Sequence, residues 1–327
     1  MAEMQPCAEE LPKEKQIVKF VAQIEKPILS SGDAISKRFD VVTDCLDHHF
    51  VKENGHESVT RGWLKKVQQE WNILQKDLPD GIHVRVYEER MDLLRACIVG
   101  SAGTPYHDNL FFFDIFFPPD YPHEPPSVHY HSGGLRLNPN LYESGKVCLS
   151  LLKTWTGTGY DKFVGKADGE KNSITYNENA FLLSCKSMMY VLHKPPKHFE
   201  KLVKEHFTCR APHILDACEA YLGGDLVGHA HDKAYISEDG SKNCSTGFKI
   251  MLGKLLPKLV TAFCEAGITS GPVNQSKPPA LYINNEIGTL LYCACMSMLV
   301  YSKIKCCLVC VTYACLVNGN SIFRLLN

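Results

Sequence analysis

The sequence has almost no excess of charge of either sign. Its 35 Lys and Arg residues balance 36 Asp and Glu residues, so the formal net charge is −1. A chain without a basic excess gives no electrostatic reason to expect a nucleic-acid partner. The first residues, MAEMQPCAEELPKEK, are acidic and lack the apolar core of a signal peptide. We therefore expect a cytoplasmic location and no binding to nucleic acid.

The sequence also lacks an apolar run of the ~20 residues that a membrane-spanning helix needs. Its two apolar runs near the end, 289–301 and 306–317, are shorter and are separated by Lys303 and Lys305. Three interpretations of this tail stay open: translated non-coding sequence, a buried or aggregation-prone hairpin, and a segment that associates with membranes. The last of these keeps endomembrane association as an alternative location.

Cysteine is plentiful, with fifteen residues, but no export signal accompanies it. A disulfide framework belongs to short secreted domains, so reduced thiols are expected. Six cysteines lie after residue 290: Cys293, Cys295, Cys306, Cys307, Cys310 and Cys315. Cys307 and Cys310 form a C-x-x-C pair, yet no second pair follows, which disfavours a metal or redox site.

A second cluster of possible metal ligands comprises Cys45, His48, His49 and His56. These residues lack the paired spacing of a tetrahedral site, so a solvated or core-edge segment is the favoured interpretation. The sequence predicts neither a metal ion nor an organic cofactor.

Residues 60–76 predict a helix that begins at Thr60, a plausible N-cap, and ends before Pro79 and Gly81. Its apolar residues recur every three or four positions: Trp63, Leu64, Val67, Trp71 and Leu74. The segments HVRVYEE, LLRACIVG and LFFFDIFF then read as strands with short connections, which favours an antiparallel meander. Five prolines between residues 118 and 126 predict a stiff, extended passage on the surface.

The order of these features resembles the core of the ubiquitin-conjugating enzymes. Four motifs carry the resemblance: FPPDYPHEPP at 117–126, NPN at 138–140, GKVCL at 145–149, and Trp155. Longer segments, including FDVVTDCLDHHFV and YHSGGLRLNPNLYESGKVCLSLL, resemble the large plant-type members associated with phosphate homeostasis. Residues 1–59 are expected to correspond to the last part of the long N-terminal extension of those members.

The resemblance implies an α+β fold with a four-stranded antiparallel meander flanked by helices. It also implies that Cys148 carries ubiquitin as a thioester, since cysteine is both nucleophilic and a good leaving group. Asn140 matches the asparagine that stabilises the oxyanion of aminolysis. Pro139 fixes the backbone of this loop, and Asn138 takes a structural hydrogen-bonding role. Ser150 stands where many relatives have an acidic residue, so no general base is identified.

The implied partners are ubiquitin, the ubiquitin-activating enzyme, a possible ubiquitin ligase and protein substrates. Lys65 and Lys66 match basic positions that meet the activating enzyme, although a solvated helix face explains them equally well. Pro122, His123 and Glu124 occupy the tip by which many relatives bind RING-type ligases, and the last two depart from the usual residues there. ATP is consumed by the activating enzyme.

The chain departs from the family after Trp155, where a long apolar crossover helix is expected. Residues 157–179 are polar and show no apolar stripe, and the next helix is predicted at Ala180–His193. Either the chain has an internal deletion after Gly159, or Ala180–His193 covers the sheet instead. A further helix is predicted over 245–266, with an interruption at Pro257.

The expected organisation has four parts: an extension with limited structure of its own (1–59), the core (60–165), a helical C-terminal region (166–280) and a cysteine-rich apolar tail (281–327). The predicted function is transfer of ubiquitin through Cys148 to substrate lysines. One alternative is a catalytically impaired variant that acts as a partner-binding module. The other is a cysteine-rich metal or redox protein.

Overall fold

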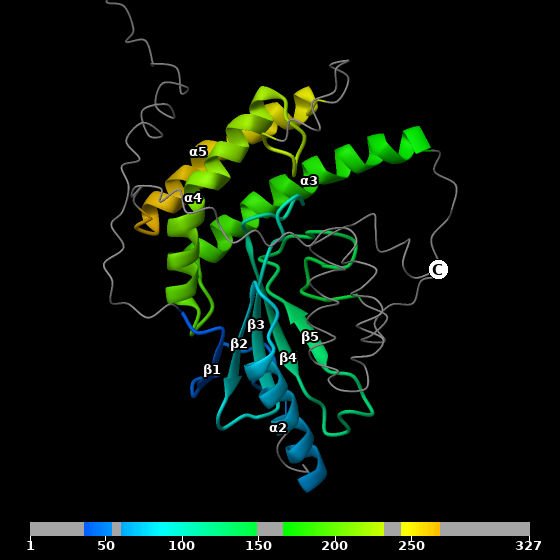
Figure 1. Ribbon diagram of the computed structural model, residues 1–327, viewed down its shortest axis with the longest axis vertical. Coiled ribbons are helices and arrows are strands. Elements are labelled where there is room, and N and C mark those ends of the chain that lie inside the picture. Colours follow the sequence, from blue (N-terminus) through cyan, green and yellow to red (C-terminus); the bar gives the residue numbers. More distant parts are fainter. Residues whose placement is uncertain (1–35, 54–59, 149–165, 232–242, 269–327) are drawn as a thin grey trace, which may run out of the picture.

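A computed structural model describes residues 36–53, 60–148, 166–231 and 243–268 of this protein. A five-stranded sheet forms its centre (Figure 1), with strands β1 Phe39–Val42, β2 Ile82–Tyr87, β3 Leu93–Val99, β4 Leu110–Phe116 and β5 Ser127–Tyr130 in that order. Strands β2 to β5 are antiparallel neighbours. The predicted α+β class and its four-stranded meander are therefore confirmed.

The fifth strand, β1, was not predicted. It lies in the segment for which limited structure was expected, and it pairs in parallel with β2 from Phe39 opposite Val84 to Val42 opposite Tyr87. The residues after it are held on the sheet, since Asp47 accepts a hydrogen bond from Arg95 at 2.8 Å and His48 Nε2 donates to the Leu94 carbonyl at 3.1 Å. Part of residues 1–59 thus belongs to the folded core.

Within the described residues, four helices accompany the sheet: α2 Arg61–Lys76, α3 Lys166–His193, α4 Glu200–Gly223 and α5 Thr246–Glu265. Helices α3, α4 and α5 lie together at the end of the sheet opposite α2 (Figure 1). Helix α2 begins as predicted, because the Thr60 hydroxyl accepts a hydrogen bond from the Trp63 amide at 3.2 Å. The indole N–H of Trp63 donates a hydrogen bond to the Pro118 carbonyl at 2.9 Å, which ties α2 to the proline-rich passage.

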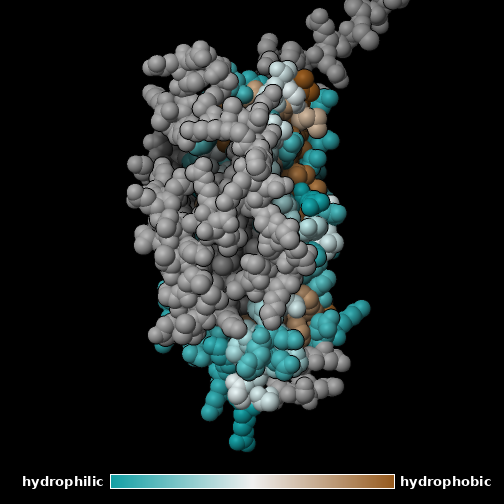
Figure 2. All heavy atoms as spheres, turned by 90° about the vertical axis from the view of Figure 1, so that its right-hand side faces the viewer, coloured by the Kyte–Doolittle hydropathy of each residue, from teal (hydrophilic) through white to brown (hydrophobic). Residues whose placement is uncertain are grey.

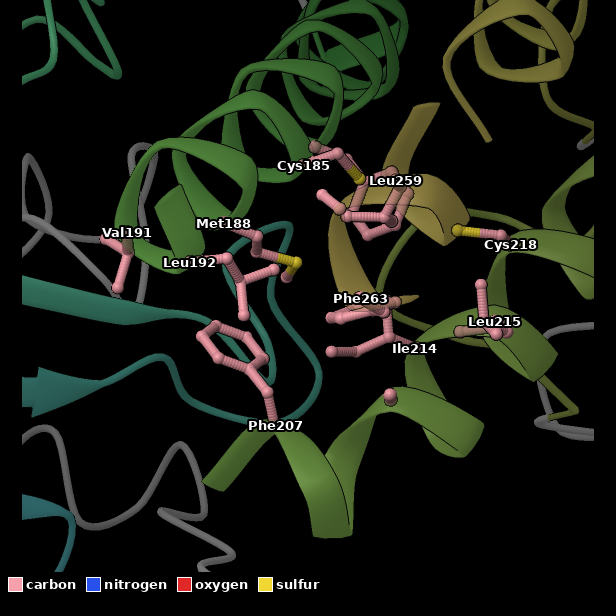
Figure 3. Packing of buried hydrophobic residues seen from close by; sticks show 14 of the residues in the cluster. Cys185, Met188, Val191, Leu192, Phe207, Ile214, Leu215, Cys218, Leu259 and Phe263 are labelled. Carbon is pink, nitrogen blue, oxygen red and sulfur yellow. The ribbon is translucent and has the colours of Figure 1, made fainter. Parts of the chain in front are cut away.

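The alternation of side chains along the strands divides the apolar interior into two cores. The α2-side core contains, among others, Trp63, Val67, Val84, Ala96 and Phe113. The helical core contains Cys97 and Phe112 from the opposite face of the sheet together with residues of α3, α4 and α5. Figure 3 shows part of the helical core, in which Met188 of α3, Phe207 and Ile214 of α4 and Phe263 of α5 point toward one another.

Helix α3 begins at Lys166, well before the predicted start at Ala180. Its described side chains reach both cores. Ala180 is a member of the α2-side core, with Tyr176 and Leu183 packed against it, whereas Phe181 belongs to the helical core. The second interpretation, in which Ala180–His193 helps to cover the sheet, therefore agrees with the packing of α3.

The predicted interruption of the last helix at Pro257 is wrong, because α5 continues through this residue. Proline removes one backbone donor, which leaves the carbonyl four residues earlier without its usual partner. That carbonyl belongs to Gly253, which is exposed, so water can bind it.

Hydrophobic side chains on the described surface are scattered among hydrophilic ones in the view of Figure 2. The large hydrophobic residues that the structure exposes among the described positions are Val41, Leu46, Ile250 and Met251. In the described ranges, no helix is both long and apolar enough to cross a membrane. They also contain no helix between β5 and α3. Residues 149–165 and the tail after Ile268, on which several predictions fall, lie outside them.

Candidate functional site

Cys148 is the last described residue of a hairpin that follows β5. We call residues 138–148 the cysteine hairpin. Its turn is closed by hydrogen bonds from the Gly145 amide to the Tyr142 carbonyl at 3.0 Å and from the Tyr142 amide to the Lys146 carbonyl at 3.1 Å. The Cys148 amide then donates to the Asn140 carbonyl at 2.9 Å. Sequence reasoning predicted that these two residues act together, and the structure brings their backbones into direct contact.

Asn138 shapes the first turn of the cysteine hairpin. Its side-chain oxygen accepts hydrogen bonds from the amides of Asn140 at 2.8 Å and Leu141 at 2.9 Å. This is the local bonding by which asparagine builds an Asx turn. Asn138 is buried, Pro139 is exposed and Asn140 is half-buried. The Asn140 side chain is thus partly open to solvent, while that of Asn138 serves the backbone.

The cysteine hairpin rests on the α2-side core through the buried side chains of Leu141 and Val147, and Leu137 just before it belongs to the same core. It is also joined to β5, since the Tyr130 amide donates to the Gly145 carbonyl at 2.7 Å. Gly145 has a φ of 83°, a conformation that L residues rarely adopt. A Cβ atom at this position would overlap the imidazole ring of His129.

Beneath β5 lies a buried carboxylate that sequence reasoning missed. Asp114 of β4 forms an ion pair with Arg95 at 2.5 Å, and both side chains are fully buried. The His131 ring nitrogen lies 3.0 Å from the same carboxylate. Burial alone would raise the pKa of Asp114, but the nearby His131 ring and the hydrogen-bonded Arg95 guanidinium hold it well below its usual range. An aspartate inside the aromatic run LFFFDIFF was the available signal, because a charged residue is seldom fully buried without a partner.

Two histidines near this carboxylate have a lowered pKa. Burial lowers the pKa of His48 to about 4, although Asp114 and the Leu94 carbonyl oppose the shift. Burial also lowers the pKa of His129 to about 4, and the neighbouring His49 and His131 add to the effect. Both His48 and His129 are therefore neutral near pH 7.

The predicted partner residues lie on α2 and on the proline-rich passage, and they are not equivalent. Lys65 of α2 is exposed, whereas the Lys66 ammonium lies 3.1 Å from the buried carboxylate of Glu70. His123 and Glu124 are exposed on the proline-rich passage, and Pro122 is half-buried. Lys65 is thus the lysine of the pair that is open to a partner.

A groove of about 540 Å³ runs between the cysteine hairpin, β5 and the residues after β1. Glu124 is part of its wall. The groove is lined by His49, Phe50, Glu124, Pro125, Pro126, Ser127, Val128, His129, Ser144, Gly145 and Lys146. Its mixed polar and apolar lining and its position beside the hairpin distinguish it from a groove between α3 and α5, whose lining includes Met189, Tyr190 and Ala262.

The described residues contain no group of three or more His, Cys, Asp or Glu side chains arranged to hold a metal ion. His48 instead bonds the Leu94 carbonyl, and His56 lies outside the described ranges. Cys307 and Cys310 also lie outside them.

Comparisons with known proteins agree with the motifs of the cysteine hairpin. A family model described as ubiquitin-conjugating enzyme matches residues 66–163. A probable ubiquitin-conjugating enzyme E2 24 from Arabidopsis thaliana is 56% identical in an alignment of length 268 that covers 71% of this chain and 29% of that protein. A putative ubiquitin-conjugating enzyme E2 38 from the same plant is 43% identical in an alignment of length 289 that covers 76% of this chain and 87% of that protein.

More distant likenesses follow the same family. A human protein described as a dual E2 ubiquitin-conjugating enzyme and E3 ubiquitin-protein ligase, BIRC6, is 28% identical over 66% of this chain and 5% of its own length. Among solved structures, a Plasmodium vivax ubiquitin conjugating enzyme E2 aligns at 28% identity over 26% of this chain and 78% of its own, with a TM-score of 0.25. The chain spans between about a quarter and a half of the length of three of its Arabidopsis relatives, at 29%, 26% and 52%.

Proposed function

Because this chain belongs to the ubiquitin-conjugating enzyme family, we propose that it accepts ubiquitin as a thioester on Cys148 and transfers it to a substrate lysine. The observation that carries the proposal is the hydrogen bond from the Cys148 amide to the Asn140 carbonyl. It holds the candidate nucleophile and the candidate oxyanion donor in one hairpin, and the hairpin itself rests on buried residues.

Loading is a transthiolation. The Cys148 thiolate attacks the carbonyl carbon of the thioester that joins ubiquitin to the activating enzyme. A new carbon–sulfur bond forms at Cys148, and the thiolate of the activating enzyme leaves. No metal or organic cofactor takes part, and the ATP that drives the sequence is spent by the activating enzyme.

Discharge is an aminolysis. A neutral lysine amine attacks the same carbonyl carbon, and negative charge develops on the carbonyl oxygen. An isopeptide bond forms as the carbon–sulfur bond to Cys148 breaks, the Cys148 thiolate leaves, and the proton lost by the amine passes to water. An N–H donor held in place for that oxygen lowers the barrier, and the half-buried Asn140 amide is proposed for this role. The contacts of Asn138 support a structural role for it, because its side-chain oxygen already bonds two backbone amides.

The proposed partners are ubiquitin, the activating enzyme, a ligase and protein substrates, in a cytoplasmic pathway of protein degradation. Lys65 is exposed on α2 and is the proposed contact for the activating enzyme. Lys66 already forms an ion pair with Glu70. His123 and Glu124 form an exposed, polar tip beside Pro122 and are proposed to contact the ligase or the substrate directly.

The test is a charging assay with activating enzyme, ubiquitin and ATP. The wild-type chain is expected to form an adduct that thiols remove, and Cys148→Ser is expected to form a thiol-resistant ester or none. A thiol-sensitive adduct of undiminished yield in Cys148→Ser would refute the assignment.

A second candidate function is a partner-binding module with little activity. The burial of Cys148 favours this candidate, because only 9% of the residue is exposed. An amine must reach the thioester carbonyl for transfer to occur, and burial hinders that approach. The same assay separates the two functions. A module of this kind would bind activating enzyme or ubiquitin with a measurable affinity and yet form no adduct.

A further inference from the structure

Two histidines from distant parts of the sequence form a ring stack beside the cysteine hairpin. The imidazoles of His49 and His129 have centroids 3.5 Å apart and planes inclined by 5°. His129 belongs to β5 and forms a β-bridge with Lys146 of the hairpin. His49 follows β1 and comes from the N-terminal part of the chain. The stack therefore joins that part directly to the wall of the hairpin.

The backbone at His49 is fixed to the sheet. Its amide donates to the buried carboxylate of Asp114 at 2.7 Å, and Asp114 is itself held by Arg95. On either side, Asp47 accepts from Arg95 and His48 donates to the Leu94 carbonyl. Residues 47–49 thus form a rigid support on which the His49 ring is mounted.

The His129 ring also meets the turn of the hairpin. The ring occupies the space that a side chain at position 145 would need, and the Gly145 carbonyl accepts a hydrogen bond from the Tyr130 amide at 2.7 Å. Three residues later, the Cys148 amide bonds the Asn140 carbonyl. A displacement of the His129 ring would therefore shift the turn at Gly145, and this turn sets the position of Cys148.

We propose that His49 and His129 are positioning residues for ubiquitin transfer, because their stacked rings brace the cysteine hairpin against the segment that follows β1. This inference rests on the proposed function. Neither residue touches the reacting atoms. Their effect is exerted through Gly145 and the backbone of the hairpin.

The electrostatic surroundings allow such a stack. His131 and His48 are the other titratable rings near the pair, Asp114 is the nearest buried anion, and Lys146 and Glu124 line the same groove. His129 is neutral near pH 7, since its pKa is lowered to about 4 chiefly by burial. No charge repulsion between two imidazolium ions therefore opposes the contact at neutral pH.

The experiment compares His49→Ala, His129→Ala, the double variant and His49→Phe, with His213→Ala as the control. His49 and His213 are both exposed, and His213 lies on α4. Three quantities are measured in the full chain: the melting temperature, the single-turnover rate at which the preformed Cys148 thioester is discharged to free lysine, and hydrogen exchange at the amides of Tyr142, Gly145 and Cys148.

We expect His49→Ala to slow discharge by about two- to tenfold. This factor corresponds to the loss of one aromatic contact that supports the hairpin in the transition state. His49→Phe should restore the rate, since it keeps a ring for the stack. The double variant should be no slower than the slower single variant, because the two changes remove one shared interaction. His213→Ala should match the wild type.

Hydrogen exchange keeps this inference distinct from the proposed function. If the wild-type chain accepts no ubiquitin, the proposed function fails, but faster exchange of the three hairpin amides in His49→Ala would still support the bracing role. Unchanged exchange in His49→Ala would overturn it. So would a fall in melting temperature with an unchanged rate of discharge, since that result assigns the stack to stability alone.

Discussion

Asn138 and Asn140 flank the same proline and make different contacts. The Asn138 side chain bonds two backbone amides, whereas the contact between Asn140 and Cys148 runs through the Asn140 backbone. Alanine at either position keeps the backbone carbonyl, but only Asn138→Ala removes an acceptor that shapes the loop. The two substitutions should therefore have separable consequences.

Asn140→Ala is expected to leave thioester formation nearly unchanged and to slow discharge to lysine by about 10²- to 10³-fold, the usual loss on removing one oxyanion donor. Asn138→Ala is expected to lower the free energy of unfolding by roughly 1–3 kcal/mol, because buried amides lose their partner. Single-turnover kinetics and urea unfolding measure the two effects. Equal loss of stability in both variants would show that Asn140 is mainly structural.

His48 should make stability depend on pH. Its pKa is about 4 in the folded state and about 6.5 when unfolded. Because the folded-state pKa is the lower one, the unfolded chain binds the proton first as the pH falls. The contribution is complete above pH 6.5 and is lost progressively toward pH 4, which amounts to about 1 kcal/mol by pH 5.5.

The matched variant is His48→Gln, whose amide can still donate to the Leu94 carbonyl. Urea unfolding at pH 7.5 and pH 5.5 should show that the wild type loses about 1 kcal/mol more than the variant between these values. The same pH dependence in both proteins would mean that the imidazole is not kept neutral by the fold.

At this scale the sequence points to the proposed reacting residues more readily than to their supports. Cys148 and Asn140 lie within one hairpin, and their spacing repeats a motif of the family that the sequence resembles. His49 and His129 are separated by a large part of the chain, and their contact depends on the parallel pairing of β1. No local pattern encodes such a pairing, although Asp114 in its aromatic strand signals a buried charge that needs a partner.

Elements with their own local signals were predicted well. Helix α2 has an N-cap, a regular apolar stripe and a clear end, and the structure places it at Arg61–Lys76. Strand β1 has four residues and pairs with a segment far along the chain, so no local sequence pattern predicts it. The start of α3 was missed because residues 166–179 lack an apolar stripe, although α3 continues into positions that pack on both cores.

Helix α5 carries a cap whose loss should be unusually costly. The Ser245 hydroxyl accepts from the Phe248 amide at 3.2 Å and donates to the buried Glu178 carboxylate at 2.7 Å. Thr60 caps α2 in the same way, and no contact with a buried carboxylate is recorded for its hydroxyl. Ser245 therefore joins α5 to α3 as well as starting a helix.

Ser245→Ala is expected to lower the free energy of unfolding by about 2 kcal/mol, against about 1 kcal/mol for Thr60→Ala. Ser245→Thr keeps the hydroxyl and should be nearly neutral. Chemical unfolding of the three variants measures the difference. If Thr60→Ala proves as costly as Ser245→Ala, the contact with Glu178 adds nothing.

For the whole molecule, the two cores are joined through shared strands. Ala96 and Cys97 of β3 enter different cores, as do Phe113 and Phe112 of β4. Neither core can lose its packing while the strands that carry both stay in place. The described chain should therefore unfold as one cooperative unit.

In a Trp155→Phe variant, tryptophan fluorescence reports on Trp63 and Trp71 of α2. Among the described helices, α3, α4 and α5 dominate the far-ultraviolet circular dichroism. We expect the two thermal transitions to coincide. Phe112→Ala, in the helical core, should cost about 3–5 kcal/mol and shift both transitions together. A fluorescence transition that stays in place while the dichroism transition moves would show two independent units.

The contact between Asp44 and Lys197 can form only after the ribosome has synthesised the long stretch of chain between them. The Lys197 ammonium lies 2.6 Å from the Asp44 carboxylate, and the two residues are 153 positions apart. At about 5–20 residues per second, a ribosome adds Lys197 roughly 8–30 s after Asp44. From the synthesis of Phe112 until α4 and α5 are made after Lys197, Cys97, Leu110 and Phe112 exist without all of the helices that bury them. The nascent chain therefore presents an apolar strand surface long enough for chaperones to bind, before the last helices are made.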